Sequence, residues 1–378
     1  MSTAGSVSDL LAARLLVCLG PGGVGKTTMS ATLALRAALG GRRVDVMTVD
    51  PAPRLLDALG VDPRHAAEPR EVALEEARAE AGAAARSARR RPARRAGRLR
   101  ALRLDPKHTF DALVTRHAPS PAAAQAILHN RIYGNLSQAL AGVGDYMAME
   151  RLLELSDQPS TDLVVLDTPP AREALDFLDA PRRLLELLNS RAVSLLGGGM
   201  RRGLGVVDLA ARAVLAAFDR ITGLHLLGDV QTFVRSFDGM YAGFAERAAR
   251  AQMLLVAADT AVVVVTTAEP ERIDQAHEFI AALSAAGIAT RAVIVNRTLP
   301  AMPVAEEIAR AAVGPALRRK LARAAHEFAA LKERETAALV SLRAGVPAEM
   351  RLFAAPDLGT EPASLGDLAR LGHNIAEL

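Results

Sequence analysis

Five short apolar runs without polar alternation recur along the chain, and segments with helical periodicity separate them. The runs are rich in valine and leucine and cover residues 14–20, 43–50, 162–168, 260–267 and 291–296. Strands that are covered on both faces lack alternation, so these runs predict the strands of a parallel sheet. The intervening segments, such as 28–40 and 271–287, end at glycine, a frequent helix stop. Strands that alternate with helices predict an α/β fold with a doubly wound, mostly parallel sheet.

Two long segments interrupt this alternation. The first, at about 60–160, includes a run of nine arginines within residues 86–103, and the second, at about 181–255, is almost wholly helical in pattern. The second segment also contains the glycine-rich stretch 195–205, which suits a mobile lid or a plain loop equally well. We therefore expect one domain over 1–378 with two helical insertions.

Composition narrows the class of protein. Half of the 378 residues are hydrophobic, which is enough for a large core, and the formal net charge is only +4. No apolar run is long enough to cross a bilayer, and the first residues lack the pattern of a signal peptide, so we interpret the protein as cytoplasmic. The single cysteine, Cys18, excludes an internal disulfide, a Cys-x-x-Cys zinc site and a three-cysteine arsenic site.

A complete phosphate-binding motif follows the first predicted strand and opens a helix. Gly20, Gly25, Lys26 and Thr27 have the spacing of a P-loop. Such a loop directs backbone N–H groups and the positive end of a helix at phosphate oxygens. Its lysine reaches the β- and γ-phosphates, and its threonine hydroxyl ligates Mg²⁺. The predicted ATP-binding residues of this loop are Gly20, Pro21, Gly22, Gly23, Val24, Gly25, Lys26, Thr27 and Thr28.

Two aspartates end predicted strands at the same edge of the sheet. Asp167 follows four apolar residues, the arrangement of a Walker B carboxylate that reaches Mg²⁺ directly or through water, so Thr27 and Asp167 are the predicted metal ligands. Asp50 ends the strand after the P-loop helix, where a carboxylate can activate the attacking water. Its alternative role is that of a turn residue before Pro51. We predict Lys26, Asp50 and Asp167 as the catalytic residues.

These motifs resemble the ArsA family, which includes the arsenite-pump ATPase and the ATPase of the guided-entry pathway for tail-anchored membrane proteins. The segments "GPGGVGKTT", "DPAPRLLDAL" and "VVLDTPPAREAL" are similar to its deviant Walker A loop, switch I and switch II, and "VIVNR" to its adenine-contacting segment. The segments 104–114 and 130–155 resemble the bacterial single-domain branch. The resemblance implies that Asn296 contacts adenine and that Pro356 lies in the loop that binds the base. It also implies a homodimer, because the chain has one P-loop.

Three departures from the family pattern bear on function. Pro21 replaces the signature lysine, which reaches the partner's phosphates, so we expect turnover that is slow or dependent on a partner. Arg54 and Arg172 are the cations that we consider as substitutes for this lysine. Switch II has Ala171, Arg172 and Glu173 where relatives have Thr-Gly-His. The missing cysteines argue against arsenite transport and against a dimer-bridging zinc.

The biological output stays open between several alternatives. The first is an ATP-driven switch that couples nucleotide state to a partner. The second is a chaperone or targeting factor for an apolar client helix or membrane-protein partner, since apolar residues recur at helical spacing over 230–244. Ordinary core packing explains that spacing equally well. The third is a ParA-like ATPase that binds DNA through the arginine run, although that run contains no stacking aromatic residue and suits a solvated loop. Metal-ion efflux is the fourth and weakest alternative.

Overall fold

The computed structural model describes residues 7–87, 97–129, 143–169, 171–188, 240–300 and 313–378. These residues form two compact units. The first comprises Met1–Arg103, Gln158–Ala174 and Ala258–Leu378, and the second comprises Leu104–Asp157 and Leu175–Ala257.

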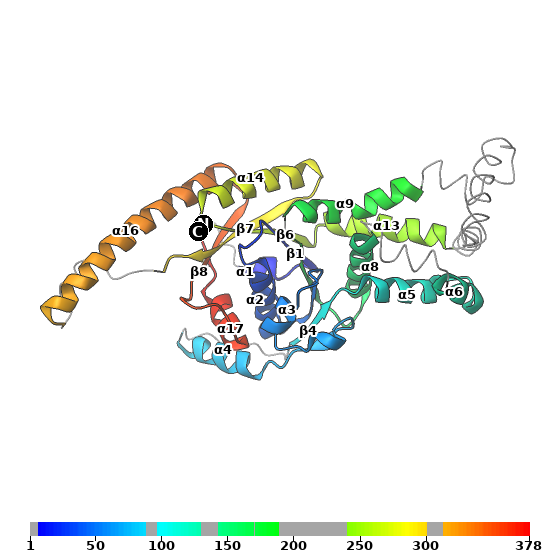
Figure 1. Ribbon diagram of the computed structural model, residues 1–378, viewed down its shortest axis with the longest axis horizontal. Coiled ribbons are helices and arrows are strands. Elements are labelled where there is room, and N and C mark those ends of the chain that lie inside the picture. Colours follow the sequence, from blue (N-terminus) through cyan, green and yellow to red (C-terminus); the bar gives the residue numbers. More distant parts are fainter. Residues whose placement is uncertain (1–6, 88–96, 130–142, 170, 189–239, 301–312) are drawn as a thin grey trace, which may run out of the picture. The chain divides into compact units, whose positions relative to one another are not determined.

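The first unit is built on a nine-stranded sheet with the order β3-β4-β2-β5-β1-β6-β7-β8-β9 (Figure 1). The seven inner strands run parallel, and the short edge strands β3 and β9 pair antiparallel with their neighbours. The strands are β1 (Leu15–Leu19), β2 (Arg43–Thr48), β3 (Arg70–Glu71), β4 (Arg98–Arg103), β5 (Leu163–Asp167), β6 (Thr260–Thr267), β7 (Thr290–Thr298), β8 (Arg351–Pro356) and β9 (Ala376–Glu377). This mostly parallel α/β architecture confirms the predicted fold class.

All five predicted strands are present as β1, β2, β5, β6 and β7, but the sequence pattern missed β4 and β8. Strand β4 lies inside the predicted basic run, so interpreting all of that run as a solvated loop was wrong for residues 98–103. Leu99, Ala101 and Leu102 are buried within β4, whereas its arginines occupy the remaining positions. The stretch 60–103 therefore contributes two strands to the sheet unit, and the first helical elaboration begins at Leu104.

The first unit also contains helices, several of which pack on this sheet. They are α1 (Val7–Leu10), α2 (Lys26–Leu39), α3 (Arg54–Ala58), α4 (Glu75–Ser87), α14 (Pro270–Ala285), α16 (Pro315–Ala344) and α17 (Leu365–Asn374), with a 3-10 turn at Pro63–His65. Helix α2 contacts β1, β2, β4 and β5, and α17 packs against α2 and α4. A continuous apolar core joins alternate residues of β1, such as Leu16 and Cys18, to α2 and α17. Helix α2 is thus fixed directly behind the P-loop.

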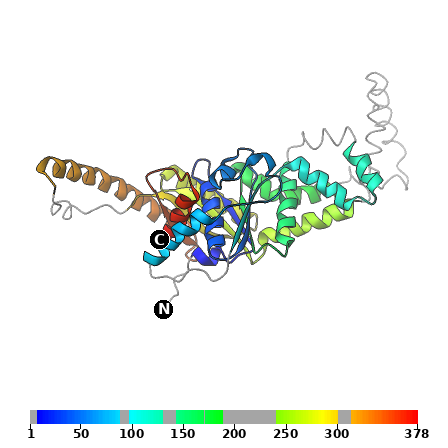
Figure 2. The same ribbon diagram turned by 90° about the horizontal axis from the view of Figure 1, so that it is seen from below.

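The second unit is helical among its described residues (Figure 2). Its helices are α5 (Pro106–His117), α6 (Pro121–Leu128), α8 (Val143–Asp157) and α13 (Tyr241–Val256), together with α9 (Ala171–Leu188) from Leu175 onward. Met240 and Phe244, from the predicted apolar stripe, are buried in its core beside Phe110 and Tyr146. These two side chains therefore serve the core. Val230, Phe233, Phe237 and the glycine-rich stretch 195–205 lie outside the described residues. No described helix is long and apolar enough to cross a membrane.

Candidate ATP site

The P-loop connects β1 to α2 through a turn that only glycine accommodates at two positions. Gly20 has φ 146° and Gly25 has φ 87°, a backbone region that other residues rarely adopt. A Cβ at Gly20 would overlap the Val265 carbonyl of β6, and a Cβ at Gly25 would overlap the Asn296 amide. The loop is thus held tightly against β6 and β7, as the predicted phosphate cradle requires.

Lys26, the first residue of α2, is buried and turned back over the loop. Its Nζ donates a 2.9 Å hydrogen bond to the carbonyl oxygen of Pro21. Burial lowers the pKa of Lys26, while the nearby charges of Asp167 and Asp50 act in the opposite direction. Pro21 has no N–H to donate, and its carbonyl is the group that holds the P-loop lysine. The predicted phosphate-binding lysine therefore lies in the electrostatic field of both predicted carboxylates.

Asp167, the last residue of β5, is buried beneath the P-loop helix among hydroxyl groups. Thr27 and Thr48 each donate a 3.0 Å hydrogen bond to its Oδ2, and Ser30 donates a 3.2 Å bond to its Oδ1. Burial raises the pKa of Asp167, although the three hydroxyl donors favour its ionised form. The structure thus joins Thr27 to Asp167, the two predicted metal ligands.

Hydroxyl and carboxylate oxygens are the donors that Mg²⁺ prefers. Among the described residues, Asp167 accepts its hydrogen bonds from neutral hydroxyls alone. A divalent cation at Thr27 and Asp167 would offset the cost of burying that carboxylate. The donor set therefore fits Mg²⁺. No group of three or more histidine, cysteine or acidic side chains suited to a metal occurs in the described part of the chain.

Asp50 does not end the strand as expected but lies two residues beyond the end of β2, and it is connected to Asp167 through one threonine. Its backbone N–H donates a 3.1 Å hydrogen bond to the Thr48 hydroxyl, which itself donates to Asp167. The Asp50 carboxylate accepts a 2.9 Å bond from the Ala52 N–H, which fixes a turn. Asp50 thus forms the turn that was its alternative role, and its carboxylate also lies close enough to influence Lys26. The predicted switch loops are linked through Thr48.

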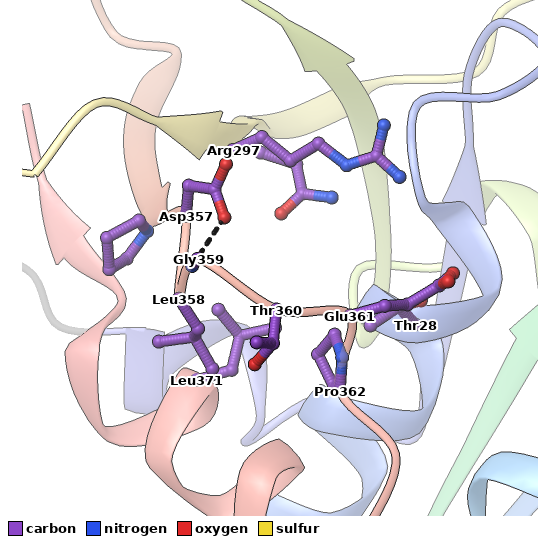
Figure 3. A pocket seen from close by; sticks show the side chains of 11 residues that line it. Thr28, Arg297, Asp357, Leu358, Gly359, Thr360, Glu361, Pro362 and Leu371 are labelled. Atoms are coloured by element: carbon purple, nitrogen blue, oxygen red, sulfur yellow. Dashed lines mark hydrogen bonds between the residues drawn. The ribbon is translucent and has the colours of Figure 1, made fainter.

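A cavity of about 380 Å³ opens beside the P-loop helix at the ends of β7 and β8 (Figure 3). It brings together Thr28, Asn296 and Pro356, three of the predicted nucleotide-binding residues. The rest of its wall comes from the loop after β8 and from two further residues: Arg297, Asp357, Leu358, Gly359, Thr360, Glu361, Pro362 and Leu371. In Figure 3 the side chains of Arg297 and Asp357 lie near the upper rim, opposite Thr360 and Leu371.

Asn296 also braces the P-loop. Its Nδ2 donates a 2.9 Å hydrogen bond to the carbonyl of Val24, and its side chain is buried. The next residue, Arg297, has φ 58°, and the Thr298 carbonyl accepts a 2.8 Å bond from the Asp357 N–H. The cavity wall is therefore tied to the phosphate loop on one side and to the loop after β8 on the other.

The structure thus brings most of the predicted site residues to one edge of the sheet, with Gly22 and Gly23 exposed at the loop's surface. Sequence reasoning missed Ser30 and Thr48. Ser30 lies one helical turn after Lys26, and that spacing was the available signal. Arg54 is exposed at the start of α3, and the side chain of Arg172 lies outside the described part.

Three arginines of the predicted basic run have partners within the first unit. Arg100 forms two 2.6 Å hydrogen bonds with the buried Asp45. Arg98 donates to the Ser160 carbonyl, and Arg103 donates to the Pro51 carbonyl. These side chains support the sheet and the loop that contains Asp50. The arginines over 89–95 lie outside the described residues.

This fold and this arrangement of loop, lysine and strand-end carboxylate define a P-loop nucleotide-binding protein. A profile of the ArsA family, the anion-transporting ATPases, matches residues 13–313. The chain belongs to this ATPase family, which confirms the resemblance seen in its motifs.

Relatives from bacteria, fungi and ciliates match parts of the chain. An uncharacterized protein of Streptomyces coelicolor is 29% identical over 291 residues, which are 76% of this chain and 63% of that protein. The ATPase GET3 of Phaeosphaeria nodorum is 28% identical over 233 residues, 57% of this chain and 64% of the relative. The ATPase ASNA1 homolog 1 of Paramecium tetraurelia is 26% identical over 170 residues, which are 45% of this chain and 44% of that protein. The matches therefore span less than two thirds of each relative.

Proposed function

We propose that the protein is a Mg²⁺-dependent ATPase that acts as a nucleotide-controlled switch. The observation that carries this proposal is the chain of contacts from Thr27 through Asp167 and Thr48 to the Asp50 loop. It connects the phosphate-binding helix to both loops that respond to a γ-phosphate in switch ATPases. A change at the phosphate is thereby transmitted to two segments of the first unit.

Each residue has a distinct proposed task. Lys26 leaves the Pro21 carbonyl to bind the β- and γ-phosphates, while Asp50 orients and deprotonates the attacking water. Thr27 and Asp167 hold Mg²⁺, which supplies charge neutralisation at the phosphates. The cavity lined by Thr28, Asn296 and Pro356 takes the adenine base, and the loop Gly20–Gly25, apart from Pro21, supplies backbone N–H groups to the phosphates.

The chain has one P-loop, and we propose that it works as a homodimer in the cytoplasm. Pro21 cannot supply the cation that relatives place there, so we expect slow turnover unless a partner completes the site. Nucleotide state would be relayed to a partner or an apolar client, as the ArsA and guided-entry resemblance suggests. No described residue supports DNA binding through the arginine run, because Arg98, Arg100 and Arg103 serve the sheet unit.

Calorimetric titration of the full chain with ATP and Mg²⁺ tests this proposal. We expect saturable binding, weakened by about tenfold or more in Lys26→Ala, because one charged hydrogen-bond donor to phosphate is lost. Lys107→Ala is the matched control, since Lys107 forms an exposed ion pair with Asp111 in the second unit. The absence of ATP binding to wild type, or equal loss in both variants, would overturn the proposal.

A further inference from the structure

The first half of α16 is an exposed helical arm. Residues 314–324 are all exposed, whereas the second half of the helix packs against α14 and buries Glu335, Ala338 and Leu342. In both views α16 extends away from the other described elements of its unit (Figures 1 and 2). The helix is 30 residues long, so its free half measures roughly 25 Å at the usual rise per residue.

A single apolar stripe runs along this helix. Its positions alternate in spacing between four and three residues, which keeps them on one face. The buried part of the stripe contains Ala338 and Leu342, and the buried Glu335 occupies the position between it and the arm. On the arm the stripe consists of Leu317, Leu321, Ala324, Phe328 and Leu331. On the arm, Leu317 is 50% exposed, Leu321 38% and Leu331 49%. The face that forms core contacts in one half is thus presented to solvent in the other.

Basic side chains border this exposed stripe. Between Pro315 and Leu331 the arm carries four basic residues, Arg318, Arg319, Lys320 and Arg323, and one acidic residue, Glu327. Glu327 forms a 3.1 Å ion pair with Arg323. At about 100° per residue, Arg318 and Lys320 lie on opposite flanks of the stripe. The arm therefore combines an apolar face with a positive charge on both of its borders.

The base of the arm is fixed to the sheet. Glu335 accepts a 2.6 Å hydrogen bond from the Leu299 N–H, and Lys332, which also pairs with Glu335, donates a 3.1 Å bond to the Leu299 carbonyl. Leu299 immediately follows β7, so the helix is anchored at the strand that carries Asn296. This anchoring holds the arm in one direction relative to its own sheet.

The charge pattern distinguishes between the partners that could cover the stripe. A second copy of the arm would bring eight basic residues together with only two acidic ones, which opposes association. Nucleic acid would satisfy the basic residues but leave the apolar stripe in water. An anionic lipid surface satisfies both the basic residues and the apolar stripe, because leucine and phenylalanine enter the interface while flanking arginine and lysine remain at the headgroups.

We propose that residues 315–331 bind the surface of an anionic membrane, with the helix lying in the plane of the interface. Basic residues close to such a surface and leucines that enter the interface both strengthen the binding. The helix lies on the membrane without spanning it, and the inference does not depend on ATP binding.

Vesicle flotation with the full-length protein tests this inference. The probes are vesicles of phosphatidylcholine alone and vesicles of phosphatidylcholine mixed with phosphatidylglycerol. We expect the protein to float with the mixed vesicles only, and binding to weaken as salt is raised. The double variant Leu317→Asp with Leu321→Asp should reduce binding by about tenfold or more, because two apolar side chains are lost from the interface.

Val340→Asp is the matched control. Val340 is 64% exposed on the same helix but lies on the opposite side from the stripe, so its variant should bind as wild type does. Unchanged thermal melts of the variants establish that the fold is intact. The inference is overturned if the protein does not float with the mixed vesicles at low salt, or if the double variant and Val340→Asp lose vesicle binding equally. It is also overturned if light scattering shows a dimer that Leu321→Asp separates into monomers. Duplex DNA binding that survives Leu317→Asp with Leu321→Asp, without flotation, would also overturn it.

Discussion

At the scale of single residues, hydroxyl groups hold the Asp167 carboxylate in place at the candidate ATP site. Asp167 accepts hydrogen bonds from the hydroxyl groups of Thr27, Ser30 and Thr48, and each donor comes from an element next to β5. The sequence predicted Thr27 through its motif. It gave no comparable signal for Thr48, because a threonine at the end of a strand is common and its hydrogen bonds depend on the packing of β2 beside β5.

Thr48→Val should slow ATP turnover by about tenfold. The valine side chain has nearly the shape of threonine but lacks the hydroxyl that connects Asp167 to the Asp50 loop. The expected change is in kcat, with ATP binding close to wild type, and single-turnover kinetics would measure it. Thr161→Val is the control, since the Thr161 hydroxyl donates to Asp45 near the opposite ends of the strands. Equal loss of turnover in the control would argue against a specific role for Thr48.

Asp167→Asn should abolish turnover yet stabilise the free protein by on the order of 1 kcal/mol at neutral pH. Because burial raises the pKa of Asp167 above its unfolded value, its ionisation opposes folding as pH rises. The stability that the protonated carboxyl confers is complete below the unfolded pKa and is lost as pH rises through the folded pKa.

Thermal melts across pH measure this effect. The stability advantage of Asp167→Asn should shrink as pH falls toward the ordinary range of aspartate. An advantage that stays constant over pH, or a variant less stable than wild type at neutral pH, would contradict the electrostatic interpretation.

At the scale of elements, the sequence predicted the strands whose composition is uniformly apolar. It missed β4 because arginines occupy positions 98, 100 and 103, and their charge concealed the alternation with Leu99 and Ala101. Tertiary pairing explains why this strand is stable, because Arg100 finds the buried Asp45 on β2. Such a partner across the sheet cannot be recognised from the local sequence. Near the end of β8 the sequence predicted only Pro356, the last residue of that strand, because the cavity residues of the following loop carry no motif.

Arg100→Ala should lower the free energy of unfolding by about 3 kcal/mol, because it leaves the carboxylate of Asp45 buried without its cation. Chemical denaturation would measure the change. Adding Asp45→Ala to Arg100→Ala should recover part of the loss, since the unpaired charge is then removed. Additive losses in the double variant would show that the pair contributes no coupling.

At the scale of the whole molecule, each chain has one P-loop, with Pro21 at the position of the signature lysine. Membership of the ArsA family establishes the class of ATPase but leaves this departure to be explained by the chain's own residues. The Pro21 carbonyl holds Lys26, a backbone contact that does not require proline and leaves the side-chain position open to a cation.

Pro21→Lys should raise ATP turnover by about tenfold or more, because a cation becomes available to the partner's phosphates. The gain should appear only at protein concentrations at which light scattering shows a dimer. If wild type already turns over ATP rapidly and Pro21→Lys does not change the rate, the missing charge is supplied by Arg54 or Arg172. The variants Arg54→Ala and Arg172→Ala would then identify which arginine supplies it.

Phosphate release from ATP by the purified full chain shows whether this loop is the site of an ATPase. We expect slow release that requires Mg²⁺, ceases when the metal is chelated, and falls by about a hundredfold or more in Lys26→Ala. Release that is independent of Mg²⁺, or equal in wild type and Lys26→Ala, would contradict the proposal that this loop is the site of an ATPase.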